Sequence, residues 1–309
     1  MNEPFHHYAR LGVVHFMLWP QTMGGDGPIV ETVERLAADT ALEAIELTRV
    51  NDPAARRRVR ATLDTARLAA AFGAQPILLS RKLDLNAPSD ADRAAAIEAV
   101  KDALAQAREL GAEGLAILSG PDPGPAGRRA ATDRLVDSLK WLCDHAARTG
   151  GPPIVLETFD RVPFGKNCLI GPSIEAAEVA RRVRRDFPAF GLMLDLSHLP
   201  LLGETPQQAV AATRDFLVHA HIGNCVMRHP AHEAYGDNHP RFGLAEGENG
   251  VAELAAYLRS LLDAGLLRCR SAGWERPIVS FEVKPLEGES AEALLAGSKR
   301  ALAAAWAAL

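Results

Sequence analysis

Long apolar runs, paired cysteines and extended basic segments are all missing from this chain of 309 residues. No apolar run approaches the roughly 20 residues that a membrane-spanning helix needs, so we expect no transmembrane segment. Residues 1–7 lack a basic segment followed by an apolar one, which predicts that there is no signal peptide. The net charge is −5, and the arginines at 56–58 and 60 form only a short basic cluster. Because nucleic-acid binding needs a basic stripe, we expect a small-molecule partner and neither nucleic acid nor a membrane.

Cysteine is scarce, and the four cysteines (143, 168, 225 and 269) are far apart and form no CxxC pair. This spacing is typical of a reduced, cytoplasmic chain and argues against a disulfide or zinc framework. Apolar residues make up 48% of the chain and charged residues 24%, which excludes global disorder and allows a large core. At roughly 100–200 residues per domain the length permits two domains, but α/β barrels reach it as one.

Short apolar runs alternate with longer helix-like stretches along the whole chain. The runs are rich in Val, Ile and Leu, which is typical of parallel strands buried on both faces. Eight strands and eight helices in alternation predict an α/β protein, a (β/α)8 TIM barrel that occupies residues 1–309 as a single domain. An open doubly wound sheet is the alternative, which the absence of GxGxxG after the first strand disfavours. The expected strands are 11–18, 42–47, 75–79, 114–118, 153–157, 191–195, 217–221 and 277–283, and the expected helices lie near 28–38, 53–72, 89–110, 128–149, 173–186, 206–214, 250–264 and 289–308.

One connection is long. Residues 222–249, after the seventh expected strand, contain no predicted helix or strand and are dense in His, Asp and Arg. Loops of this length inside a compact domain are usually functional, so we expect this one to lie over the C-terminal mouth of the barrel. Within it, Arg241 is a candidate for binding a substrate oxygen or anion, and His239 is a second candidate substrate contact. The alternative is a solvated loop held by its own turns.

The last four expected strands each end in a carboxylate or an imidazole. The strand-end residues are Glu157, Asp195, His219 with His221, and Glu282. Each alone would more simply cap a helix or form an ion pair, but in a barrel these four ends meet at the catalytic mouth. Carboxylates crowded together raise one another's pKa unless a cation lies between them. Such a ligand set suits one divalent metal ion, Mn²⁺ first, with Co²⁺, Mg²⁺ or Zn²⁺ as alternatives.

These residues also carry a resemblance. The motifs Leu-Glu157-Thr, Leu-Asp195-Leu-Ser-His198, His219-Ala-His221 and Phe-Glu282, in this order, resemble the xylose isomerase-like barrel superfamily of sugar isomerases, ketose 3-epimerases, inosose dehydratases and AP endonucleases. The resemblance covers essentially the whole barrel, and the Asp-x-x-His motif is its most specific part. It implies a single metal ion held by Glu157, Asp195, His221 and Glu282. It further implies that His198 faces the substrate and that, as in the epimerase branch, Glu157 and Glu282 are the catalytic acid/base pair.

The first two expected strands add further candidates for substrate binding. His15 and Glu46 face the mouth of the barrel by their position in these strands. We expect His15 to contact the substrate, with core packing as the alternative. Trp19, together with Phe16, is expected to supply the apolar wall on which a sugar ring stacks.

Two short segments resemble a second group of proteins. Val-His15-Phe-Met and Gly-Asp237-Asn-His-Pro-Arg241-Phe-Gly are similar to the larger subunit of bacterial C-glycoside deglycosidases, which act on 3-keto glycosides with the same barrel and metal. This resemblance implies a lyase that cleaves a carbon–carbon bond after the same enolisation. It also implies a small partner subunit, beside the homo-oligomer that the outer helices permit.

The leading prediction is a metal-dependent enzyme of carbohydrate metabolism that removes a proton next to a metal-polarised carbonyl of a sugar or keto-sugar. It would act as an isomerase or epimerase, with the deglycosidase-type lyase as the alternative. An AP endonuclease-like nuclease is a distant alternative, because the third and fourth expected strands end at Leu79-Ser80 and Leu118-Ser119 and lack a histidine. A non-catalytic sugar-binding barrel would not need two opposed glutamates.

Overall fold

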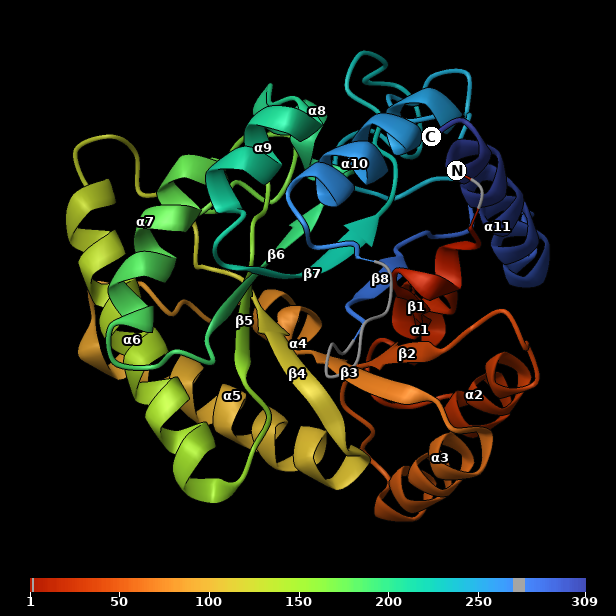
Figure 1. Ribbon diagram of the computed structural model, residues 1–309. Coiled ribbons are helices and arrows are strands. Elements are labelled where there is room, and N and C mark those ends of the chain that lie inside the picture. The colour runs from red at the N-terminus through yellow and green to blue at the C-terminus, as the bar shows by residue number, and fades with distance from the viewer. Residues whose placement is uncertain (2, 269–275) are drawn as a thin grey trace.

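The computed structural model describes residues 1, 3–268 and 276–309. Eight parallel strands pair in chain order, and β8 pairs with β1 to close the barrel. The (β/α)8 barrel expected from the sequence is therefore confirmed, with the helices packed around its outside (Figure 1). The strands are β1 (Arg10–Val14), β2 (Ala44–Leu47), β3 (Ala69–Gly73), β4 (Ala112–Ile117), β5 (Ile154–Glu157), β6 (Gly191–Asp195), β7 (Leu217–Ile222) and β8 (Ile278–Phe281).

The helices begin and end at capping residues that the sequence supplies. The side chain of Ser89 accepts a hydrogen bond from the backbone of Asp92 at the start of α5, and Gly111 ends this helix with a φ of 68°. The long outer helices are α2 (Ile29–Ala37), α3 (Pro53–Ala66), α5 (Asp90–Leu110), α6 (Arg128–Thr149), α7 (Ser173–Arg184), α9 (Pro206–Thr213), α10 (Val251–Asp263) and α11 (Ala291–Ala307). Shorter helices within the connections are η1 (Phe5–His7), α1 (His15–Leu18), η2 (Pro20–Thr22), α4 (Gln75–Ser80) and α8 (His198–Leu202).

The expected strand at 75–79 is wrong. Residues 69–73 form β3, which pairs with β2 and β4, and the residues expected as a strand form α4. The run Ala-Ala-Ala-Phe has high helix propensity, so the sequence pattern assigned it to the end of the preceding helix. Strand pairing overrides that propensity, and α3 ends at Ala66, where Arg67 adopts a left-handed conformation with a φ of 57°.

The first expected strand is too long by one helical turn. Extended pairing stops at Val14, and α1 starts directly afterwards at His15. Consequently His15 lies at the start of α1 and not inside the strand, and Trp19, which lies beyond the expected strand, follows α1.

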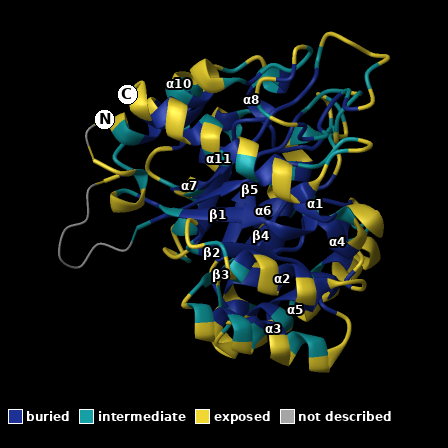
Figure 2. Ribbon diagram, turned by 90° about the vertical axis from the view of Figure 1, so that its right-hand side faces the viewer, coloured by how far each residue is buried: buried dark blue, intermediate teal, exposed yellow. Residues whose placement is uncertain are grey.

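Strand residues alternate between two environments. One set, including Val13, Ile45 and Phe72, packs against the helices in the main core. The other set lies in two smaller clusters of mostly small side chains: Ala44, Ala71 and Ile278 in one, Ala116, Val155 and Met193 in the other. Figure 2 shows the strands buried inside a layer of helices whose outer faces are exposed.

The two ends of the chain lie side by side beside α11 (Figure 1), where Trp306 Nε1 donates to the carbonyl of Glu3 at 2.7 Å. The described cysteines are buried free thiols: Cys143, Cys168 and Cys225. Burial raises the pKa of Cys143 to about 12. Cys269 lies outside the described residues. Within the described part of the chain, no helix has both the length and the apolar character needed to cross a bilayer.

Candidate active site

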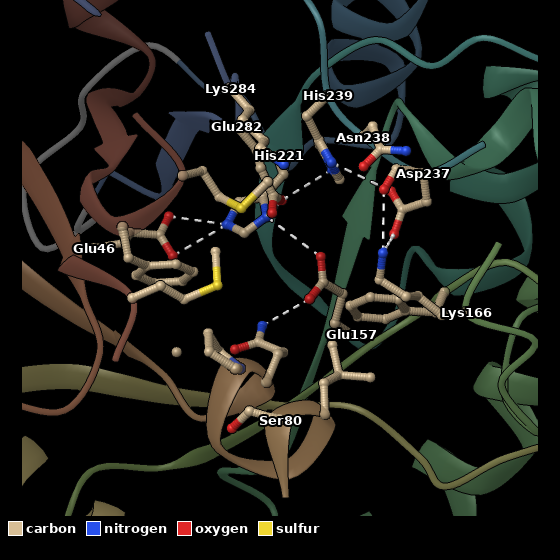
Figure 3. A pocket seen from close by; sticks show the side chains of 18 residues that line it. Glu46, Ser80, Glu157, Lys166, His221, Asp237, Asn238, His239, Glu282 and Lys284 are labelled. Atoms are coloured by element: carbon tan, nitrogen blue, oxygen red, sulfur yellow. Dashed lines mark hydrogen bonds and ion pairs between the residues drawn. The ribbon is translucent and has the colours of Figure 1, made fainter. Parts of the chain in front are cut away.

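A cavity of about 400 Å³ opens at the C-terminal end of the barrel (Figure 3). Five of the charged or ionisable lining residues come from the ends of β5, β7 and β8 and from the loop after β7: Glu157, His221, Asp237, His239 and Glu282. Apolar lining residues come mainly from the first third of the chain: Phe16, Met17, Met23, Pro76 and Leu79. The cavity therefore combines a charged region with an apolar one.

The four predicted metal ligands come together. Glu157, Asp195, His221 and Glu282 each offer one donor atom, and these atoms all lie within 4.8 Å of one another. The strand register produces this proximity, because Asp195 pairs directly with His221, and Phe281, which precedes Glu282, pairs with Ile222. His221 Nδ1 lies 2.6 Å from Glu282 Oε2 and 3.3 Å from Glu157 Oε1.

Burial and mutual charge perturb these groups strongly. Burial raises the pKa of Glu157, and the nearby charge of Glu282 raises it further. Burial also opposes ionisation of Asp195, but His239 and His198 outweigh it and lower the pKa of this carboxyl. The carboxylates of Glu46 and Glu282 keep the pKa of His221 well above its ordinary value despite burial. In the metal-free protein, the His221 imidazolium thus balances the surrounding carboxylates.

The donor set fits a divalent cation. It contains three carboxylates and one imidazole, the ligand types that suit Mn²⁺, Co²⁺ and Mg²⁺. Glu157 Oε1 is buried and accepts no hydrogen bond of good geometry, as expected of an oxygen whose partner is an ion. Three smaller groups in the described residues share or adjoin these ligands: Glu46, His219 and His221; Asp195, His198 and His239; Asp160, His198 and Asp237.

Gln75 is a site residue that the sequence analysis missed. Its Nε2 donates to Glu157 Oε2 at 2.7 Å, and the side chain lines the cavity while only 7% exposed. Gly73 makes room for it, because a Cβ there would lie 2.7 Å from Gln75 Oε1. The misplaced third strand hid this residue. Gly73 at the end of a strand and Pro76 in the first turn of a helix were the signals that could have revealed it.

Glu46 lines the cavity, as its predicted substrate-binding role requires, but its carboxylate is occupied by protein groups. Oε1 lies 2.7 Å from His219 Nε2 and 3.0 Å from His221 Nε2. Burial disfavours its charge, yet the two histidines lower the pKa of Glu46 well below its ordinary value. Glu46 is therefore an ionised acceptor between two imidazoles.

The two other predicted substrate histidines differ in position. His239 lines the cavity, and its Nε2 lies 3.0 Å from Asp195 Oδ2. Burial opposes protonation of His239, but Glu282 and Asp237 raise its pKa to about 10. His198 is fully buried behind the cavity, 3.7 Å from Asp195 Oδ2 and 3.6 Å from Asp237 Oδ1. His198 thus contacts the carboxylates that surround the cavity, and its predicted substrate contact stays a prediction.

Three residues predicted to bind substrate point elsewhere. His15 Nε2 lies 2.7 Å from Thr32 Oγ1 inside the core, and burial lowers the pKa of His15 to about 4. Trp19 belongs to the main core, and its ring lies 5.6 Å from that of His15. Arg241 pairs with Glu289 at 2.6 Å with its side chain 47% exposed. Of the two residues expected to supply the apolar wall, Phe16 lines the cavity, together with Met17 on α1, and Trp19 does not.

The loop 222–249 reaches the cavity and is also held by its own hydrogen bonds. Asp237, Asn238 and His239 line the cavity. Asn224 lies near the start of the loop and Asn249 at its end. Asn224 Oδ1 accepts a hydrogen bond from the backbone N–H of Asn249 at 2.7 Å, which holds the two ends of the loop together. The sequence offered a loop over the mouth of the barrel or a loop held by its own turns, and the two interpretations are compatible.

Comparison with known proteins gives a family and a fold. The family model described as xylose isomerase-like TIM barrel matches residues 34–295. Among solved structures, the chain is similar to an L-ribulose 3-epimerase (TM-score 0.71, 18% identity, covering 97% of this chain and 96% of that one). It is also similar to the D-psicose 3-epimerase of Clostridium cellulolyticum H10 (0.67, 17%, 96% and 97%) and to a family 2 AP endonuclease of Brucella melitensis (0.65, 18%, 92% and 96%). No curated protein matches the chain.

Proposed function

Because the chain belongs to the xylose isomerase-like TIM barrel family, we propose that it is a divalent-metal-dependent isomerase or epimerase of a sugar or keto-sugar. The observation that carries the proposal is the set of Glu157, Asp195, His221 and Glu282 gathered at the edge of the cavity. The names of the similar ketose 3-epimerases support a sugar as the substrate.

The chemistry divides between the two glutamates. A bound divalent cation, Mn²⁺ first, would polarise the sugar carbonyl and stabilise the charge that develops on it. Glu157, whose pKa is raised by burial, removes a proton from the carbon next to the carbonyl, and Glu282 returns one. Positioned bases contribute roughly 10²–10⁴-fold each. Gln75 holds Glu157 Oε2 in a fixed direction during this step.

The test is a solvent-exchange screen. Ketopentoses and ketohexoses are incubated in D₂O with the protein and Mn²⁺ and followed by NMR. We expect one carbon-bound proton of a substrate to exchange as its isomer or epimer appears, and we expect EDTA to stop both processes. Full activity in a verified metal-free preparation would contradict the proposal.

A second candidate, the deglycosidase-type lyase, is favoured by the apolar part of the cavity. Phe16, Met17, Met23 and Leu79 offer more apolar surface than a free sugar uses, and an apolar substituent on a glycoside would cover them. Adding 3-keto glycosides to the same screen distinguishes the two functions. The lyase releases the free substituent, and it would need the small partner subunit to do so.

The nuclease alternative gains no support from the corrected strands. The third strand ends at Gly73 and the fourth at Ile117, so neither ends in a histidine, and the net charge is −5.

A further inference from the structure

Glu46 reaches His221 through the barrel interior, since β1 and β8 lie between their strands, β2 and β7, in the closed barrel. Its Oε1 and Oε2 lie 3.0 and 3.1 Å from His221 Nε2, and Figure 3 shows Glu46 on one side of the imidazole and Glu157 on the other. We propose that Glu46, held by His219, is a positioning residue that fixes His221 with Nδ1 directed at the metal site. The inference rests on the proposed function, because it assumes that His221 is a metal ligand.

The argument begins with the two nitrogens of the imidazole. A histidine that binds a metal offers the lone pair of one ring nitrogen and keeps a proton on the other. Nδ1 faces Glu282 at 2.6 Å and Glu157 at 3.3 Å, on the side where the carboxylates gather. Among the described residues, Nε2 hydrogen-bonds to Glu46, and it therefore donates its proton to that carboxylate. A carboxylate in this place orients the ring and makes the other nitrogen a stronger ligand.

Glu46 itself is not one of the four ligands. Its carboxylate groups with His219 and His221 but not with Glu157, Asp195 and Glu282, whose donor atoms lie together with that of His221. In His221, Nδ1 is thus directed at the metal site, and Nε2 is directed at Glu46.

His219 fixes the carboxylate in turn. It lies two residues before His221 on β7, so both side chains point to the same face of the strand. Its Nε2 lies 2.7 Å from Glu46 Oε1, and the two imidazole rings are 5.3 Å apart at 83°. Glu46 is therefore held from two directions and cannot swing toward the cavity without losing a charged hydrogen bond.

Small residues lie beside this pair in the strand register. Barrel interiors usually hold layers of bulky branched residues, but here Ala71 pairs with Glu46, and Gly12 pairs with Ala44, two residues before Glu46. At Gly12 a Cβ would lie only 2.3 Å from Ser280 Oγ. Well-packed apolar residues are often as stabilising as a buried charged pair or more so, so stability alone does not explain Glu46 and His219 in this place.

The experiment uses Zn²⁺ as a diamagnetic probe of the whole protein. In protein labelled with ¹⁵N-histidine, long-range ¹H–¹⁵N NMR reports which nitrogen of His221 carries the proton, with the signal assigned by its loss in His221→Asn. Zn²⁺ and Mn²⁺ affinities are then measured by competition titration for wild type, Glu46→Gln and His219→Gln. Glu43→Gln is the matched control, because Glu43 immediately precedes the same strand and pairs with Arg276, away from His221.

We expect the Zn²⁺-loaded wild-type protein to carry the single ring proton of His221 on Nε2 and to bind Zn²⁺ through Nδ1. Glu46→Gln should weaken both metals by roughly 10–100-fold, His219→Gln should weaken them less, and Glu43→Gln should match wild type. A proton on Nδ1 of His221 in the Zn²⁺-loaded wild-type protein, or an unchanged affinity in folded Glu46→Gln, overturns the inference and leaves the proposed function standing. Failure of wild-type protein to bind either metal overturns the proposed function and the inference with it. The wild-type spectrum decides the question even if Glu46→Gln does not fold.

Discussion

The two halves of the barrel mouth carry different residues. On the β5–β8 side, β5 and β6 end in Glu157 and Asp195, His221 is the second-last residue of β7, and Glu282 directly follows β8. On the β1–β4 side, α1 and α4 start almost directly after β1 and β3 and present apolar side chains such as Phe16 and Leu79 to the cavity. From this side, Glu46 and Gln75 contact ligand residues and so reach the metal site indirectly: Glu46 through His221 and Gln75 through Glu157. The β5–β8 side thus carries the candidate metal ligands, and we call it the ligand half. The β1–β4 side shapes the cavity and holds the ligands in place, and we call it the supporting half.

The largest expected effect comes from breaking the ligand half. Asp195→Ala and His221→Ala should lose the metal ion and reduce activity by about 10²–10³-fold or more, because the charge on the reacting carbonyl loses its stabilisation. Metal content after dialysis and the rate of proton exchange measure both effects, and circular dichroism checks the fold. Arg241→Ala is the control, since Arg241 pairs with Glu289 and should leave metal content unchanged. If Asp195→Ala or His221→Ala keeps its activity without bound metal, the residues of the ligand half do not act as metal ligands in catalysis, and the two halves do not differ in the way described.

The next effect separates the catalytic role of the glutamates from their ligand role. Glu157→Gln and Glu282→Gln keep the shape of the side chain but accept no proton, so we expect losses of roughly 10²–10⁴-fold. Removing a charge also weakens metal binding, so exchange is measured at saturating Mn²⁺ with occupancy checked by metal analysis. If both fully metallated variants exchange the substrate proton at the wild-type rate, neither glutamate is the base.

A smaller effect is expected from the supporting half. Gln75→Met has a similar length but no donor, so Glu157 Oε2 loses its 2.7 Å hydrogen bond. Hydrogen bonds to charged groups contribute about 1.5–3 kcal/mol, which corresponds to roughly 10–100-fold in kcat/KM. Gln75→Glu places a second carboxylate against Glu157 and should be worse than Gln75→Met. Equal kcat/KM for Gln75→Met and wild type would show that the contact does not matter.

The smallest effect on activity is expected at His15, whose variant should change stability instead. The folded protein holds the pKa of His15 at about 4, below the ordinary 6.5, because the ring is buried. The unfolded chain therefore binds the proton first as pH falls through 6.5, so the stability contribution present above this pH is lost toward pH 4. Between pH 7 and pH 5 the loss amounts to about 2 kcal/mol.

His15→Gln tests this prediction through the free energy of unfolding in urea at both pH values. The variant should lose less stability than wild type between pH 7 and pH 5 and should keep kcat/KM within about twofold at pH 7. A raised KM with an unchanged pH dependence of stability would instead favour the substrate contact that the sequence suggested.

The ligand half was predictable from the sequence and the supporting half was not. A polar residue at the end of an apolar run is visible along the chain, and a parallel barrel brings all such ends to one mouth. The run at 69–72 has no such mark, because alanine favours a helix until neighbouring strands pair with it. With the third strand expected at 75–79, Gln75 was assigned to the start of a strand, which lies at the other end of the barrel from the mouth, and its position at the mouth was lost.

By itself, the sequence determined the barrel, seven of its strand positions and the four candidate ligands, since local hydrophobic pattern and strand ends record these features. Only the tertiary structure decided which groups hold those ligands. Glu46 and His221 are 175 residues apart in the chain, and Gln75 and Glu157 are 82 apart. Such contacts depend on how the closed barrel places strands that are not neighbours and on the space left by Gly73. No local pattern encodes that space, because it exists only after all eight strands have paired.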